Sequence, residues 1–159
     1  MKRILLALGA FLMLSAAAQA QTEAEMKKWV EYMTPGDIHN MIASWDGDWT
    51  GDIITWMAPD APPSNSTGSC TNKMIMGGRY QLGNFDGSFS GMPFQGMSLL
   101  AYDNSKKVFE SIWVDNMGTG VMHLKGTWSD ATKTLTLTGP MLDPTSGKEI
   151  TMKETLQIV

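Results

Sequence analysis

The period of the apolar residues divides the chain into two regions. Up to Trp45 these residues recur at the helical spacing i, i+3, i+4 and i+7, whereas from Trp49 onward they alternate with polar residues. The pattern therefore predicts two short helices within residues 21–46 and a β domain over residues 47–159. Because no helical pattern separates the strands, the fold class is all-β, an antiparallel up-and-down meander.

Each predicted helix has one apolar stripe. In the first helix the stripe is Met26, Trp29, Val30 and Met33, and Thr22 has capping-box spacing to Glu25. The stripe of the second helix is Ile38, Met41, Ile42 and Trp45, and Gly47 ends that helix. Thr34 is the expected N-cap of the second helix, with Pro35 at its first helical position. We expect Ile42 and Trp45 to be buried against one end of the β domain, near Trp49.

Eight strands are predicted: Trp49–Ala58, Ser69–Met76, Arg79–Phe85, Gln95–Asp103, Lys107–Asp115, Thr119–Ser129, Lys133–Gly139 and Lys148–Val159. Gly77-Gly78, Asp103-Asn104 and Asp143–Gly147 are predicted turns, and Pro59–Gly68 is a predicted long loop. A meander of this length leaves exposed edges unless it curls, so we expect it to close, fully or in part, into a barrel. The alternation runs on to Val159, which leaves two readings open: the last strand pairs with the first, or the chain is truncated there.

The first twenty residues have the order of a signal peptide. Lys2 and Arg3 precede an apolar run, and Ala18–Ala20 has the small-residue pattern of a cleavage site. The apolar run is shorter than the roughly 20 residues that span a bilayer. We therefore expect an exported protein, periplasmic or extracellular, that is not inserted in the membrane.

Charge and cysteine content exclude several classes of function. Removal of the signal peptide leaves ten basic and sixteen acidic residues, and clusters of Lys and Arg that would bind nucleic acid are absent from the sequence. Cys70 is the single cysteine, so an internal disulfide is impossible, and we expect a small, partly buried side chain there. Two histidines and one cysteine do not form a zinc site, and the methionines are too scattered for a copper site. We expect no metal and no cofactor.

A series of short segments is similar to a known family. The segments are Gly47–Gly51, Trp56–Pro59, Ala61–Pro63, Ser66–Gly68, Met76–Tyr80, Gly91–Phe94, Gly96, Tyr102–Asn104 and Trp113–Gly120. In this order they resemble the bacterial family called domain of unknown function 1579, from about Thr34 to the C-terminus. The resemblance implies a lipocalin-like (calycin) barrel and no established activity. Members of that family usually continue past the position of Val159 with another pair of strands, which leaves closure of the barrel open.

Four residues are candidate ligand-binding residues. Glu154 falls on the apolar face of the last strand, where a carboxylate needs a partner, and Arg79 is the one arginine outside the signal peptide. We therefore expect a Glu154–Arg79 pair inside the barrel, unless a β-bulge turns Glu154 to solvent. His39 borders the stripe of the second helix, and Trp113 supplies bulky apolar area for a cavity wall.

Glu110 has the same ambiguity as Glu154, because it shares a face with Val108, Ile112 and Val114. His123 falls in a predicted strand outside the segments that carry the family resemblance.

Three functions remain open. The first is a non-catalytic barrel that binds a small apolar ligand, because a barrel rich in Met and Trp offers an apolar lumen. The second is a structural or interaction protein of the cell envelope whose barrel is filled by its own side chains. The third is an enzyme that uses His39 and Glu154 as acid and base. Catalytic motifs are absent from the sequence, so we assign no catalytic residues.

The signal peptide gives the first testable prediction. In the exported protein we expect the N-terminus at Gln21 or within about two residues of it, because signal peptidase cleaves after an Ala-x-Ala pattern. Intact-mass measurement of protein recovered from the periplasm or medium checks this prediction. Exported protein that still begins at Met1 would contradict it.

Overall fold

The computed structural model describes residues 22–159. The predicted signal peptide, residues 1–20, lies outside the described residues. The chain forms two units, divided between Thr34 and Pro35. The first unit contributes one helix to the described part, at residues 22–33. None of the helices in the described part is long and apolar enough to cross a membrane.

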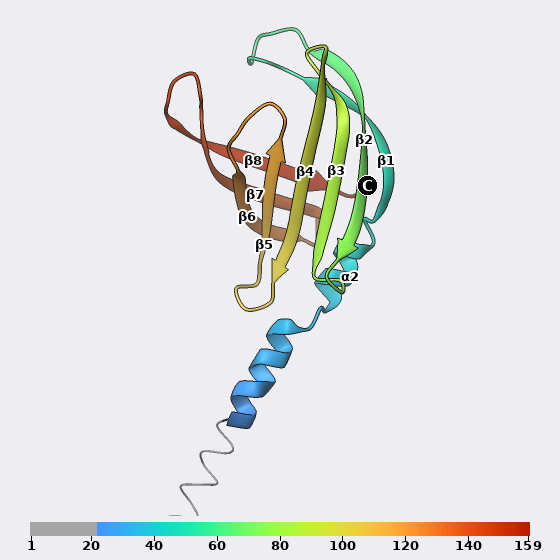
Figure 1. Ribbon diagram of the computed structural model, residues 1–159, viewed down its shortest axis with the longest axis vertical. Coiled ribbons are helices and arrows are strands. Elements are labelled where there is room, and N and C mark those ends of the chain that lie inside the picture. The colour runs from blue at the N-terminus through green and yellow to red at the C-terminus, as the bar shows by residue number, and fades with distance from the viewer. Residues whose placement is uncertain (1–21) are drawn as a thin grey trace, which may run out of the picture. The chain divides into compact units, whose positions relative to one another are not determined.

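The second unit contains helix α2 and an antiparallel sheet (Figure 1). The helix spans Asp37–Ala43. The strands are β1 (Gly47–Thr55), β2 (Ser64–Ile75), β3 (Tyr80–Phe89), β4 (Met92–Asp103), β5 (Val108–Asp115), β6 (Met122–Ser129), β7 (Thr134–Leu142) and β8 (Glu149–Gln157). Each strand pairs with the next along the chain, so the predicted up-and-down meander is confirmed.

The sheet is a curled half barrel. Its strand order runs from β1 to β8, and no pairing joins β8 back to β1 within residues 22–159. In Figure 1 the strands β6, β7 and β8 cross behind β3 and β4, so that one face of the sheet becomes concave. The expected closure is therefore incomplete, and the concave face stays open between the two edge strands.

Two glycines allow β6 and β7 to approach closely where the sheet curls. A Cβ atom on Gly126 would collide with the carbonyl oxygen of Thr136, and one on Gly139 would collide with that of His123. These contacts are with backbone atoms, which cannot move aside as a flexible side chain can. The close approach of β6 and β7 therefore requires glycine at both positions.

The strand predictions were right in number and order, but several boundaries were wrong, with the largest differences at the start of β2 and in the β3–β4 hairpin. β2 begins at Ser64, inside the predicted loop, because residues 64–68 pair with the end of β1. The β3–β4 hairpin reaches Phe89 and Met92, beyond the predicted ends. Ser90 and Gly91 at its tip both have positive φ angles, as a tight two-residue hairpin turn requires.

Thr34 is not the N-cap of α2, contrary to our expectation. Its hydroxyl donates a hydrogen bond to the carbonyl oxygen of Val30 at 2.6 Å, which places it at the end of the first helix. The N-cap is Gly36, whose backbone N–H donates to Nδ1 of His39 at 3.1 Å. His39, at the third helical position, thus accepts the backbone N–H of the N-cap residue, as a Glu or Gln side chain does in a capping box.

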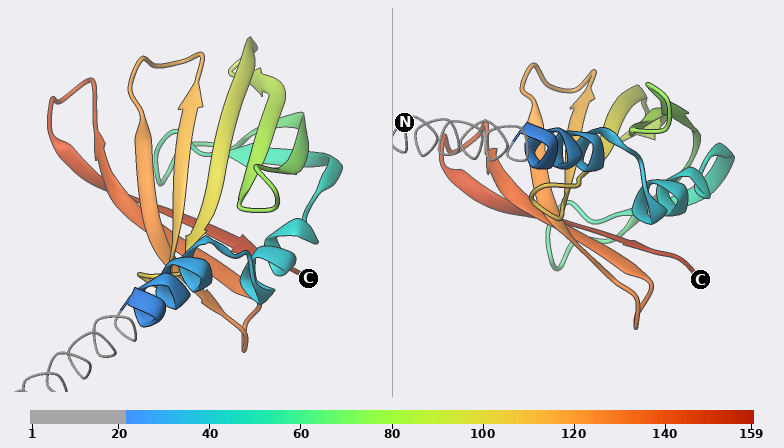
Figure 2. Two further views of the ribbon diagram at one scale, coloured as in Figure 1. Left: turned by 60° about the horizontal axis from the view of Figure 1, so that its bottom comes forward. Right: turned by 90° about the horizontal axis from the view of Figure 1, so that it is seen from below.

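Helix α2 lies at one end of the concave face of the sheet (Figure 2), and the core residues come from this helix segment and from β5, β6 and β7. The fully or nearly buried apolar side chains of the core are Ile42, Trp45, Phe109, Leu124, Leu135 and Leu137. The rings of Trp45 and Trp128 lie 5.6 Å apart, and Ile42 has no exposed surface. The predicted burial of Ile42 and Trp45 near Trp49 is confirmed, and Trp49 Nε1 donates to the Trp45 carbonyl oxygen at 3.2 Å.

Side chains from β2 and β3 hold the C-terminal end of α2. Gln81 Nε2 donates to the Ile42 carbonyl oxygen at 2.8 Å and to Asp46 Oδ1 at 2.8 Å. Asn72 Nδ2 donates to the Trp45 carbonyl oxygen at 3.3 Å. The last carbonyls of a helix have no partner within the helix. The Ile42 and Trp45 carbonyl oxygens also accept from the Trp45 N–H and from Trp49 Nε1, so the sheet side chains are second donors that join this end of α2 to β2 and β3.

The burial of Trp45 gives a stability prediction. Replacement of Trp45 by Ala should lower the free energy of unfolding by about 3–5 kcal/mol, because the indole is 8% exposed and packs against Trp128. Urea-induced unfolding followed by circular dichroism measures this loss. Trp56 is 56% exposed and serves as the matched control, with an expected change within about 0.5 kcal/mol for Trp56→Ala. Equal losses for the two variants would mean that α2 is not packed on the sheet.

Candidate functional site

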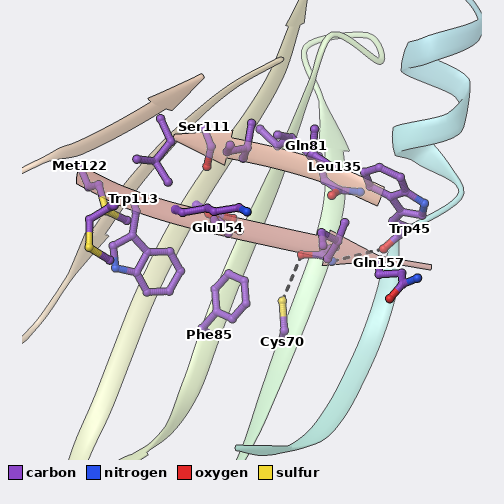
Figure 3. A pocket seen from close by; sticks show the side chains of 18 of the residues that line it. Trp45, Cys70, Gln81, Phe85, Ser111, Trp113, Met122, Leu135, Glu154 and Gln157 are labelled. Atoms are coloured by element: carbon purple, nitrogen blue, oxygen red, sulfur yellow. Dashed lines mark hydrogen bonds between the residues drawn. The ribbon is translucent and has the colours of Figure 1, made fainter. Parts of the chain in front are cut away.

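The concave face of the half barrel encloses a cavity of about 680 Å³ (Figure 3). At the α2 end its wall contains Trp45 and Gln81, and at the other end it contains Trp113 and Met122. All of the strands contribute lining residues. The cavity is thus built by the inward positions of the whole sheet and not by a single loop.

An aromatic cluster forms the end of the cavity away from α2. The ring of Trp113 lies 5.0 Å from Phe85, in an edge-to-face contact, and stacks on Phe94 at 6.1 Å. Trp113 Nε1 donates a hydrogen bond to Asp115 Oδ2 at 2.7 Å. Gly96 lies under the indole, and a side chain at Gly96 would collide with it. Trp113 therefore lines the cavity, as predicted, and its neighbours hold the indole ring in one orientation.

Aliphatic side chains of β6, β7 and β8 form most of the opposite wall. Leu124, Leu135 and Leu137 are at most 2% exposed, and they belong to the core as well as to the cavity lining. Met122, Met152, Leu156 and Ile158 extend this wall along the open side. A ligand in the cavity would meet mainly apolar surface.

Polar groups in the lining are few, and several are already engaged. Asn72 and Gln81 hold the end of α2, and the Cys70 thiol donates to Asn72 Oδ1 at 3.1 Å. Burial raises the pKa of the Cys70 thiol, so it stays protonated near neutral pH and is a poor nucleophile. Ser98 and Ser111 add hydroxyl groups from β4 and β5.

Glu154 is the acidic residue of the cavity lining. It lies opposite Leu137 in the register of β7 and β8, on the face predicted from the alternation of the last strand. Water reaches its side chain through the open side, yet the surrounding protein atoms raise the pKa of its carboxyl by desolvation. No hydrogen bond or ion pair joins it to another of the residues 22–159.

The expected Glu154–Arg79 pair does not form. Arg79 lies at the turn between β2 and β3, where its guanidinium donates to the carbonyl oxygen of Met76 at 3.1 Å. Residue 79 precedes the first residue of β3, so the strand alternation that places side chains inside the barrel does not apply to it. Arg79 is not among the residues that line the cavity.

His39 is buried in α2 and does not line the cavity either. Its Nδ1 accepts the Gly36 N–H, and its ring packs edge-on against Tyr102 at 6.0 Å. Burial lowers the pKa of His39, a hydrogen bond with the backbone of Tyr102 opposes this shift, and the positive charge of Arg79 adds to it. His39 is therefore neutral near pH 7 and acts as part of the helix cap.

Glu110 and His123 lie on the outer face of the sheet, with charged neighbours. His123 Nε2 is 2.9 Å from Glu110 Oε2, and the ammonium groups of Lys106 and Lys125 lie 3.2 and 3.5 Å from Glu110 Oε1. Partial burial raises the pKa of Glu110, but the hydrogen bonds from Lys106 and His123 outweigh it and hold the pKa below its usual value. Within residues 22–159 no group of three or more His, Cys, Asp or Glu is arranged to hold a metal ion.

The sequence reasoning missed Asn72 and Gln81, which hold α2, and Phe85 and Met122, which line the cavity. A signal for Gln81 existed in the alternation of β3, where it shares the inward face with Phe85. A long polar side chain at an inward position indicates a buried hydrogen-bonding partner.

The unpartnered Glu154 carboxyl gives a prediction about stability and pH. Because its folded-state pKa is raised, its ionisation destabilises the native state as pH rises through that pKa, and the effect is absent at a pH below 4.5. Glu154→Gln should therefore raise the melting temperature at pH 8 and change it little at pH 4. Scanning calorimetry at both pH values measures this, with Glu149→Gln on the same strand as the control. A lower melting temperature for Glu154→Gln at pH 8 would reveal a native partner of the carboxylate.

The chain matches a known family over most of its length. The family described as protein of unknown function (DUF1579) matches residues 34–159. No curated protein and no solved structure matches the chain significantly. The matched region contains α2, the whole sheet and every residue of the cavity lining. The chain belongs to the DUF1579 family of proteins of unknown function.

Proposed function

We propose that this protein is a non-catalytic barrel that binds one small, largely apolar ligand in the cavity of its half barrel. The observation that carries the proposal is the cavity itself, at about 680 Å³ and with mainly aliphatic and aromatic walls. Ligand sites in proteins commonly have volumes of about 300–1,000 Å³, apolar walls and a few polar groups. The cavity of this chain fits that description.

The alternatives from the sequence fit the geometry less well. A structural or interaction protein with a filled barrel would place side chains where this sheet encloses open volume. An enzyme that uses His39 and Glu154 would need both groups near one substrate, whereas Glu154 lines the cavity and His39 caps a helix. We therefore favour binding without catalysis.

We also propose that the protein acts outside the cytoplasm, in the periplasm or extracellular space. The support is the sequence of residues 1–20, in which basic residues are followed by an apolar run and then by an Ala-x-Ala pattern, as in a signal peptide. A carrier of apolar compounds is useful in such a compartment, because these compounds dissolve poorly in the water that separates one membrane from another.

Occupation of the cavity can be tested with a neutral fluorescent probe, N-phenyl-1-naphthylamine, which brightens in apolar surroundings. Ser98 lines the cavity, so Ser98→Phe should fill part of it and weaken probe binding about tenfold or more, a loss of at least about 1.4 kcal/mol. Met97 precedes it on the same strand, faces the other side and is 44% exposed. Met97→Phe is the matched control and should bind like the native protein.

Circular dichroism and urea unfolding of both variants would show that each is folded, because a larger side chain can strain a packed wall. Should Ser98→Phe not fold, Ser111→Val offers a smaller change in the lining. Native mass spectrometry of protein from its own host provides a second readout, as a retained small molecule adds its mass. A native protein that neither binds the probe nor retains a molecule contradicts the proposed function.

A further inference from the structure

Glu154 distinguishes this cavity from a simple apolar one. It is the acidic residue of the lining, and no other residue of the described part, 22–159, pairs with it. We propose that the ligand is a cationic amphiphile, an organic amine with an apolar body, and that the Glu154 carboxylate binds its ammonium head. This inference rests on the proposed function and names the ligand class of the same site.

The first argument is the missing partner. Water reaches the Glu154 side chain, but the cavity wall removes part of its hydration, and a partly desolvated carboxylate is unfavourable unless a donor or an opposite charge compensates it. Asn72 and Gln81, the amide groups of the lining nearest to α2, already donate to backbone carbonyls of that segment. A bound ammonium group would provide both the donors and the charge that Glu154 lacks.

The second argument is the sign of the charge. A ligand with a carboxylate or phosphate head would bring a second negative charge into the cavity beside Glu154. Lys153 also borders the cavity, but strand alternation puts its side chain on the outer face of β8. On that face Lys153 pairs with Thr138 of β7, which in turn pairs with Lys125 of β6. No ion pair joins Lys153 to Glu154, so it does not neutralise the carboxylate.

The third argument is the aromatic content of the same cavity. Trp45, Trp49, Phe85 and Trp113 all line it, and Figure 3 shows Trp113 and Phe85 together with Glu154 around one open volume. The faces of aromatic rings attract organic cations, Trp most strongly. Aromatic rings with a single carboxylate are suited to an ammonium head, while the aliphatic wall of β6, β7 and β8 is suited to the apolar body.

The test compares three ligands that share one alkyl chain and differ in the head group: dodecylamine, dodecanol and dodecanoate. Each ligand is titrated against bound N-phenyl-1-naphthylamine at pH 8, at concentrations at which it stays in solution as a monomer. For the native protein we expect the amine to bind about tenfold or more tightly than the alcohol, and dodecanoate to bind most weakly. In Glu154→Gln, amine and alcohol should bind equally within about threefold.

Glu149→Gln on the same strand, outside the cavity lining, is the control for a general attraction of amines to an acidic protein, and it should keep the native preference. Equal binding of amine and alcohol by the native protein overturns the inference. It is overturned as well by a preference for amine that survives in Glu154→Gln, or by tighter binding of dodecanoate. In each of these cases the proposed function stands, whereas failure of all three ligands to displace the probe counts against the function itself.

Discussion

The cavity depends on how the end of α2 is held to the sheet. The helix is short, and the backbone N–H groups that follow it satisfy its last carbonyl groups without joining it to the sheet. Gln81, which is 5% exposed, adds a second donor to the Ile42 carbonyl oxygen, and Asn72 adds one to the Trp45 carbonyl oxygen. These bonds place Ile42 and Trp45 over the core residues of β5, β6 and β7. One end of the half barrel is thereby covered, and the concave face becomes a cavity with a floor instead of a channel open at both ends.

A cavity also needs open volume, and small residues on the inward face of the sheet leave that volume free. Gly83 faces inward among Asn72, Ser98 and Phe85, and Gly96 lies under Trp113. A larger side chain at Gly83 would collide with Phe85, and one at Gly96 would collide with Trp113, so either ring would have to move. Gly126 and Gly139 act differently, because they let the backbones of β6 and β7 come closer than a Cβ atom would allow. Glycine therefore has two roles in this fold: it leaves room for aromatic side chains beside the cavity, and it lets two strands pack closely.

The alternation of residues was sufficient to predict the strands, their order and the inward position of Glu154, because one face of each strand is apolar and that pattern is local. The predicted Arg79 partner was wrong because a turn residue has no assigned face, and its contacts depend on the path of the chain. The N-cap was misassigned for a related reason: Thr34 can cap a following helix or end a preceding one, and both positions suit its hydroxyl. Gln81 was missed because its partner is a helix carbonyl distant in sequence. The sequence thus predicts which face a side chain occupies, but not which distant group it meets there.

The lack of a partner changes the role that Glu154 can have in the protein. Paired with an arginine, it would be a structural residue whose loss weakens the fold. Without a partner, its charge opposes folding, because a carboxylate opposite Leu137 gives up part of its hydration and gains nothing in return. A leucine or methionine would suit that position better if the cavity wall served stability alone. A residue that opposes stability at a ligand-accessible position is the pattern expected where function and stability compete. Removal of its charge should therefore act in opposite directions on the two properties, strengthening the fold and weakening selectivity for a cation. A purely structural residue would move both in the same direction.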